Sequence, residues 1–171
     1  MKKVVRIFWV LTLILFFSIL GYLGKVGTKS IQSTDLSGEN INGITILQSI
    51  HSEELIKKNI TPVKRLENLL DSNYYELSNG LIIAINKDDL IEKIIVTSST
   101  SNKTFKTARS ISLGDSLEKV IKTYGGNYYK QESELTSEPI TGYMDIDEKI
   151  KIEFWSYEGK VDEIRIELTN Y

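Results

Sequence analysis

The 171-residue chain contains no cysteine, one histidine and two prolines. Without cysteine it cannot form disulfides, perform thiol catalysis, build a zinc–cysteine site or carry a lipid on an N-terminal cysteine. A single histidine leaves little scope for a histidine metal site or a catalytic triad. The remaining composition, 41% hydrophobic and 26% charged residues, is that of an ordinary globular protein. The length allows one domain of usual size or two small units.

The longest hydrophobic run lies near the N-terminus. Three cationic residues precede it: Lys2, Lys3 and Arg6. The run itself, residues 7–23, carries no charge, and as a helix it would be about 26 Å long, close to the thickness of a hydrocarbon core. Trp9 and Tyr22 lie near its two ends, where amphipathic rings favour the membrane interface. The pattern predicts a transmembrane signal anchor at residues 7–24, held in the lipid bilayer.

A cleaved signal peptide is the alternative. Such peptides have an apolar stretch of about 7–15 residues followed by a small-x-small cleavage site. This run is longer, and the nearest weak match to a cleavage site is Thr28-Lys29-Ser30. Either way, the cationic residues before the run predict an N-inside orientation, with residues 1–6 in the cytoplasm. The expected location is the cell membrane, single-pass with the C-terminal domain extracytoplasmic, or secreted if the segment is cleaved.

The chain beyond residue 26 is acidic. It contains 17 basic and 23 acidic side chains, a net charge of −6. Phosphate backbones would repel such a domain, so nucleic acid is not an expected partner.

The remainder of the chain shows a loose internal repeat. Residues 61–75 align without gaps on residues 115–129, and both segments end in Asn-Tyr-Tyr. Residues 81–96 align in the same way on residues 151–166. Identities are few, so chance alignment is the alternative to a duplication. The predicted division is a Gly/Ser/Thr/Asn-rich flexible stalk at 25–43, a first αβ repeat at 44–100, a linker at 101–109 and a second αβ repeat at 110–171.

Each repeat is expected to lay a helix on an antiparallel sheet. In the second repeat, Asp115 is a good helix cap, apolar residues recur at helical spacing from Leu117, and Gly125 ends the helix. In the first repeat, Thr61 caps a helix that has a proline in its first turn. A further short helix is predicted at 52–59.

Alternation of apolar and polar residues predicts two β-hairpins, at 81–96 and at 150–168. The first hairpin is apolar on both faces and must be covered on both, either by the rest of the domain or by a partner. The predicted fold class is α+β: an N-terminal transmembrane helix followed by a tandem repeat of helix plus antiparallel β-sheet.

The second repeat resembles a known family. Its helix segment runs Ile111-Ser-Leu-Gly114-Asp-Ser116-Leu-Glu-Lys-Val120-Ile-Lys-Thr-Tyr-Gly125, and its hairpin ends in Gly159-Lys-Val161-Asp-Glu-Ile164. This pattern is similar to the helix-plus-sheet unit of the BamE/SmpA outer-membrane assembly lipoproteins and, in tandem, to the beta-lactamase inhibitor protein fold. Similar units occur in small secreted or anchored proteins of Gram-positive bacteria.

The resemblance spans Ser110 to Leu168 and is weaker in the first copy, where Ile60 stands at the position of Gly114. It implies a binding module built on a sheet rather than a reaction. Because the chain has no lipoprotein cysteine, the anchoring and role of the BamE family are not implied.

The sequence contains no catalytic motif. His51 stands before the short predicted helix, and Gly114-Asp115-Ser116 is explained as a helix cap rather than as a nucleophile elbow. Asp145-x-Asp147-Glu148 resembles the start of a calcium loop but lacks the later ligands, so we interpret it as a solvated acidic loop. We therefore expect no catalytic residue, no metal and no cofactor.

The aromatic residues are the best candidates for binding. Trp155 and Tyr157 fall by alternation on the strand face opposite the predicted core, unless residues 130–149 fold over Trp155 and bury it. The residues predicted to contact a partner are Trp155, Tyr157, Tyr143, Tyr128 and Tyr129. The expected function is non-catalytic binding of an envelope or secreted protein at the bacterial cell envelope. The alternatives are a cell-envelope hydrolase that uses paired Asp/Glu, and a structural spacer.

Overall fold

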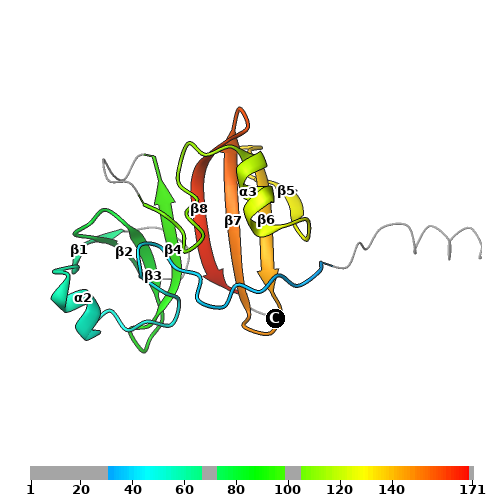
Figure 1. The fold of residues 1–171 in the computed structure, drawn as a ribbon. Coiled ribbons are helices and arrows are strands. Elements are labelled where there is room, and N and C mark those ends of the chain that lie inside the picture. The colour runs from blue at the N-terminus through cyan, green and yellow to red at the C-terminus, as the bar shows by residue number, and fades with distance from the viewer. Residues whose placement is uncertain (1–30, 67–72, 99–104, 170–171) are drawn as a thin grey trace, which may run out of the picture. The chain divides into compact units, whose positions relative to one another are not determined.

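The fold is built on one antiparallel β-sheet of eight strands (Figure 1). It is described here from a computed structural model, which describes residues 31–66, 73–98 and 105–169. The elements in these ranges are α2 (Glu53–Lys57), β1 (Pro62–Leu66), β2 (Asn73–Leu77), β3 (Ile82–Ile85), β4 (Ile91–Thr97), α3 (Leu117–Tyr124), β5 (Tyr129–Glu132), β6 (Pro139–Asp145), β7 (Ile150–Tyr157) and β8 (Lys160–Leu168).

The strand order is β1-β2-β3-β4-β8-β7-β6-β5. Strands β1 to β4 form one meander and strands β5 to β8 form another, and the two meanders join where β4 pairs with β8. At this junction Ile94 lies opposite Ile166 and Val96 lies opposite Ile164, so buried apolar side chains continue from one meander into the next.

This architecture shows that the predicted fold class is wrong. The described chain is not a tandem of helix-plus-sheet repeats but a single sheet, accompanied by two helices of only 5 and 8 residues. The physical reason lies in β4 and β8, whose apolar side chains would be exposed if either strand were left at an edge. The two predicted hairpins are present, as β3–β4 and β7–β8.

The core lies against one face of the sheet. Val120 and Tyr124 of α3 pack there with Phe154 of β7, and Leu55 of α2 belongs to the same buried cluster. Helix α3 begins after Ser116, whose hydroxyl accepts a hydrogen bond from the Lys119 N–H, one residue later than the predicted cap Asp115.

The predicted helix beginning at Thr61 is wrong over its first turns. Residues 62–66 form β1, an edge strand paired with β2. Proline is tolerated at the first position of an edge strand, and the main-chain pairing with β2 outweighs a helical pattern that rested on three apolar residues. Val63, which the helix would have buried, is 62% exposed.

The predicted stalk at 25–43 is also wrong from residue 31 onward. Leu36, Ile41 and Ile44 are completely buried, and we call this folded segment, residues 31–46, the N-terminal strap. The Leu36 N–H donates to the buried Asp145 carboxylate at 2.8 Å, which also caps the amides that follow it. The strap is polar in composition and its few apolar residues are spaced irregularly, yet all of them except Ile31 enter the core.

Part of the predicted linker at 101–109 is likewise folded, since Phe105 and Thr107 are buried. The segment 130–149, which was the alternative cover for Trp155, supplies β5 and β6 beside β7.

In the described part of the chain, no helix has the length and apolar character needed to cross a bilayer. The predicted anchor at 7–24, with Trp9 and Tyr22, lies outside the described residues.

Candidate functional site

The candidate site is the face of the sheet opposite the core, which we call the open face. Residues directly opposite one another in antiparallel strands share a face, so the side chains form rows across the strands. Three rows cross from β4 toward β5: Lys93–Glu167–Lys151–Met144, Ile95–Arg165–Glu153–Gly142–Tyr129, and Thr97–Glu163–Trp155–Ile140–Gln131.

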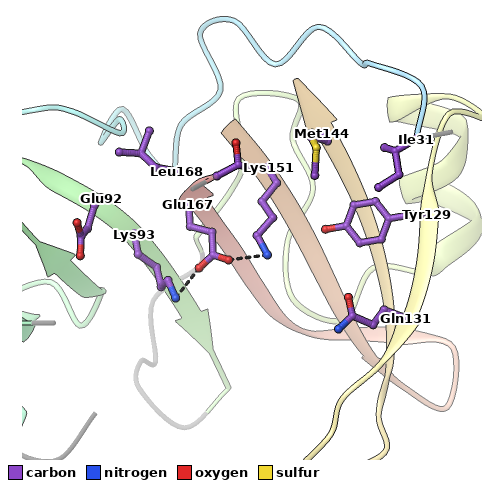
Figure 2. A pocket seen from close by; sticks show the side chains of 10 residues that line it. Ile31, Glu92, Lys93, Tyr129, Gln131, Met144, Lys151, Glu167 and Leu168 are labelled. Atoms are coloured by element: carbon purple, nitrogen blue, oxygen red, sulfur yellow. Dashed lines mark ion pairs between the residues drawn. The ribbon is translucent and has the colours of Figure 1, made fainter. Parts of the chain in front are cut away.

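Four charged side chains of these rows form a continuous set of ion pairs, which we call the charge ladder: Lys93, Glu167, Lys151 and Glu153. Lys93 Nζ lies 2.5 Å from Glu167 Oε2, and Lys151 Nζ lies 2.6 Å from Glu167 Oε1 (Figure 2). Lys151 Nζ also lies 2.9 Å from Glu153 Oε1. The ladder therefore alternates in sign and carries no net charge.

The ladder is sheltered from solvent. The exposed fraction of its side chains ranges from 7% for Glu153 to 25% for Lys93. Burial alone would raise the pKa of Glu167, but the hydrogen bonds from Lys151 and Lys93 outweigh it and hold that pKa below its usual value. Burial would lower the pKa of Lys151, but its contacts with the two carboxylates raise it instead. Both shifts favour the charged forms, so Glu167 and Lys151 stay ionised at neutral pH.

Tyr129 lies flat against the open face over Gly142. A Cβ at position 142 would overlap the Tyr129 ring, so only glycine leaves room for it. From this position the Tyr129 hydroxyl donates to Glu153 Oε1 at 2.7 Å. The glycine thus lets an edge-strand aromatic residue reach the end of the charge ladder.

Trp155 is covered by a neighbouring cation. The Arg165 guanidinium lies 3.9 Å from the centroid of the Trp155 ring, and it also pairs with Glu163. Among the described residues the buried Trp155 Nε1 has no hydrogen-bond partner. Burial raises the pKa of Glu163, although Arg165 opposes the shift.

The rows line a cavity of about 470 Å³ on the open face (Figure 2). Lys93 and Glu167 lie on one side of it, Tyr129 and Gln131 of β5 lie on the other, and Ile31 of the strap lies at its rim. The cavity thus spans strands of both meanders, and neither meander alone would form it.

The structure does not bring the five predicted contact residues into one patch. Trp155 and Tyr129 share the open face. Tyr143 is completely buried in the core, where its hydroxyl donates to Gly125 O, and Tyr128 packs against it from the helix side. Tyr157 is 64% exposed at the end of β7, beside the turn into β8.

Sequence reasoning missed the charge ladder, although part of the signal was present. The turn at residues 158–159 alone would place Lys151 opposite Ile166, but a register irregularity between Trp155 and Ser156 shifts the pairing by one residue. Lys151 therefore falls opposite Glu167, and Glu153 falls opposite Arg165. Charged residues of opposite sign at facing positions predict cross-strand pairs. Lys93 could not be found this way, because the pairing of β4 with β8 is non-local.

The other titratable groups give less support for a functional site. His51 pairs with Asp89 at 3.3 Å on the surface. No cluster of three or more His, Asp or Glu side chains suited to a metal occurs within the described ranges. Asp145, predicted to lie in a solvated loop, is instead buried and ties the strap to β6.

Comparison with known protein families, characterised proteins and solved structures found no match to the chain.

Proposed function

We propose that the protein is a non-catalytic binding module of the cell envelope and that its open face binds another protein. The observation that supports this best is the cavity lined by Tyr129 and by three members of the charge ladder, Lys93, Glu167 and Lys151. A hollow of about 470 Å³ falls within the size range of binding clefts. The side chains that line it stand on paired strands and are held by one another, so little ordering is needed when a partner binds.

The chemistry of the face suits a protein surface of mixed charge. Alternating ammonium and carboxylate groups select a partner through the positions of its charges rather than through its net charge. Arg165 stacked on Trp155 adds the type of residue pair that dominates binding energy at protein interfaces.

The proposal includes a membrane anchor at residues 7–24, in the N-inside orientation, which places the module outside the cytoplasm. The partner in this proposal is an envelope or secreted protein.

A photo-crosslink from Thr169 tests the proposal. Thr169 lines the cavity and takes no part in the charge ladder, so a benzoylphenylalanine there leaves the ladder in place. In cells of the source organism we expect one specific adduct with another protein, which is lost when Lys151→Met is added. The control is the same probe at Leu135, which is 95% exposed on the β5–β6 hairpin. Identical adducts from both positions, or none from Thr169, would overturn the proposal.

A hydrolase is the second candidate, because Glu153 and Glu167 converge on Lys151. Paired-carboxylate hydrolysis needs one carboxyl that stays protonated as the general acid. The pKa of Glu167 is lowered, and the Lys151 ammonium occupies the space between the two carboxylates. The pKa of Glu163 is raised, but Glu163 lies four residues along β8 from Glu167, about 13 Å away, which exceeds the separation such enzymes use.

A structural spacer is disfavoured for a different reason. A spacer has no need for Arg165 stacked on Trp155 or for a glycine that admits Tyr129 to the open face.

A further inference from the structure

The two edges of the sheet differ in how they are protected. Strand β1 begins with Pro62 and has a register irregularity between Pro62 and Lys64, and both features hinder the addition of a further strand. Strand β5, at the other edge, contains no proline, and its pairing with β6 is regular. A regular edge strand without proline leaves main-chain N–H and C=O groups available for pairing with another chain.

The hydrogen bonds of β5 show which of its residues point outward. The Ser133 N–H donates to Glu138 O, toward β6. Because this direction alternates along a strand, Gln131 also points toward β6, whereas Lys130 and Glu132 direct their N–H and C=O groups away from the sheet. Both of these side chains are exposed, and both lie on the helix side of the sheet.

We propose that β5 pairs with β5 of a second copy of this chain, antiparallel about a two-fold axis at Gln131. In this register Lys130 of each copy faces Glu132 of the other, and Gln131 faces Gln131. Lys130 and Glu132 are the residues whose main-chain groups point outward, so each facing pair exchanges two hydrogen bonds. The edge of one copy is thus complementary to itself in both main chain and charge.

Charge selects this register over its neighbours. A two-fold axis keeps the faces of the sheet aligned only when the register shifts by an even number of residues. A shift one way places Lys130 against Lys130, and a shift the other way places Glu132 against Glu132. Like charges directly opposite one another are destabilising, whereas the proposed register has two opposite-charge pairs.

The pairing also covers apolar surface. A groove of about 340 Å³ lies beside the edge, lined by Leu117 and Ile121 of α3 and by residues of β5 and β6. The aliphatic stems of the second copy's Lys130 and Glu132 fall on this side of the sheet. On the other side, the two Gln131 side chains meet at the cavity of the open face, so the cavities of the two copies become neighbours.

Cysteine cross-linking tests the pairing cleanly, because the full chain contains no cysteine. In the proposed register the two Gln131 Cα atoms lie about 4.5 Å apart, within the range a disulfide bridges. We expect Gln131→Cys in the full chain to form a covalent dimer when intact cells are treated with a membrane-permeant thiol oxidant. The control is Leu135→Cys, more exposed but far from the axis, which should remain monomeric. Equal cross-linking of both variants would mean random collision and would overturn the proposal.

A charge swap tests the register itself. In the Gln131→Cys background, Lys130→Glu alone and Glu132→Lys alone each place like charges opposite one another, and we expect the covalent dimer to fall about tenfold. The two variants are complementary to each other, so co-expression with different tags should restore cross-linking as heterodimers. If the single variants cross-link as well as the parent, or if co-expression restores nothing, the two chains do not meet through this edge.

Discussion

Lys151 is the residue on which the charge ladder depends most. Its ammonium lies between two carboxylates, at 2.6 Å from Glu167 and 2.9 Å from Glu153, and only 23% of its side chain is exposed. Removing one partner from a sheltered ion pair leaves an uncompensated charge, which costs more than the pair itself contributes. At this site the removal leaves the sheltered Glu153 without its ammonium partner and leaves Glu167 with Lys93 alone.

We expect Lys151→Met to lower the free energy of unfolding by about 2–3 kcal/mol at neutral pH. Urea denaturation of the variant and the parent measures this loss. The control is Lys87→Met, which removes an exposed lysine from a turn and should change stability by less than about 0.5 kcal/mol. Equal effects of the two changes would show that the ladder contributes nothing specific.

The loss should also shrink in acid. The pKa of Glu167 is lower in the folded state, so its contribution to stability is present above the unfolded pKa of about 4.5 and is lost as pH falls through the folded pKa. Below that range the Glu167 carboxylate is protonated, so its ion pair with Lys151 no longer contributes to the loss.

Gly142 is the second residue whose identity the open face requires. A Cβ there would lie 2.6 Å from Tyr129 Cε2 and closer still to two other atoms of the side chain. We expect Gly142→Ala to displace the ring, break its hydrogen bond to Glu153 and cost about 1–3 kcal/mol. Thermal or urea unfolding measures the cost, and Gly126→Ala is the control because a Cβ there meets nothing within 4 Å. In a Tyr129→Ala background, Gly142→Ala should cost much less, and simple additivity of the two changes would refute the steric argument.

At the scale of elements, the sequence correctly predicted the elements that are determined by residues close together in the chain. The helix at 117–124 and the hairpins β3–β4 and β7–β8 follow from apolar spacing and turn residues within short stretches. Strand β1 was predicted to be helical because Val63, Leu66 and Leu70 recur at helical spacing, a pattern too short to outweigh pairing with β2. The ion pair between Lys93 and Glu167 depends on which strands meet at the centre of the sheet, and no local signal carries that information.

The strap is the element that was hardest to predict from the sequence. It bonds to β6 through the Thr34 N–H and to residues 106–108 through Asn40 and Asn42, and the chain just beyond it bonds to Ile91 through Leu47. Its polar composition resembles that of a linker. Its main-chain N–H and C=O groups form hydrogen bonds in turns and with side chains rather than with a neighbouring β-strand.

Glu39 of the strap gives the protein a pH dependence of opposite sign to that of Glu167. Its side chain is 1% exposed, accepts a hydrogen bond from the Ala108 N–H at 2.9 Å and lies 3.5 Å from Arg109. Burial raises the pKa of Glu39 above its usual value despite these contacts. The stability that this shift contributes is present below the unfolded pKa of about 4.5 and is lost as pH rises through the folded pKa.

We therefore expect the stability of the parent, relative to Glu39→Gln, to decline as pH rises from about 4.5. Relative to Glu167→Gln, the parent should instead gain stability over the acid range as pH rises. The free energy of unfolding of the three proteins, measured at a series of pH values, gives both slopes. Two slopes of the same sign would contradict the opposite environments of these carboxylates.

At the scale of the whole molecule, the sheet depends on contacts between its two meanders. Among the strands that the structure describes, only the pairing of β4 with β8 joins them within the sheet. The strap adds a second connection, since it bonds to β6 of one meander and continues into Leu47, which bonds to β4 of the other (Figure 1). A cavity built from both meanders is therefore only as rigid as these two connections.

This arrangement predicts that residues 31–171 fold and residues 44–171 do not. The shorter chain loses Leu36 and Ile41, both completely buried, and each such loss costs about 2–5 kcal/mol. Their sum is comparable with the whole stability of a domain of this size, about 5–15 kcal/mol. Circular dichroism during urea titration should show a cooperative transition for residues 31–171 and none for residues 44–171. Leu36→Ala in the longer chain should fall between them, because it removes one of the two side chains and leaves the strap's hydrogen bonds in place. A transition at the same urea concentration for 31–171 and 44–171 would mean that the strap only lies on the sheet, and the rigidity of the open face would then have to come from β4 and β8 alone.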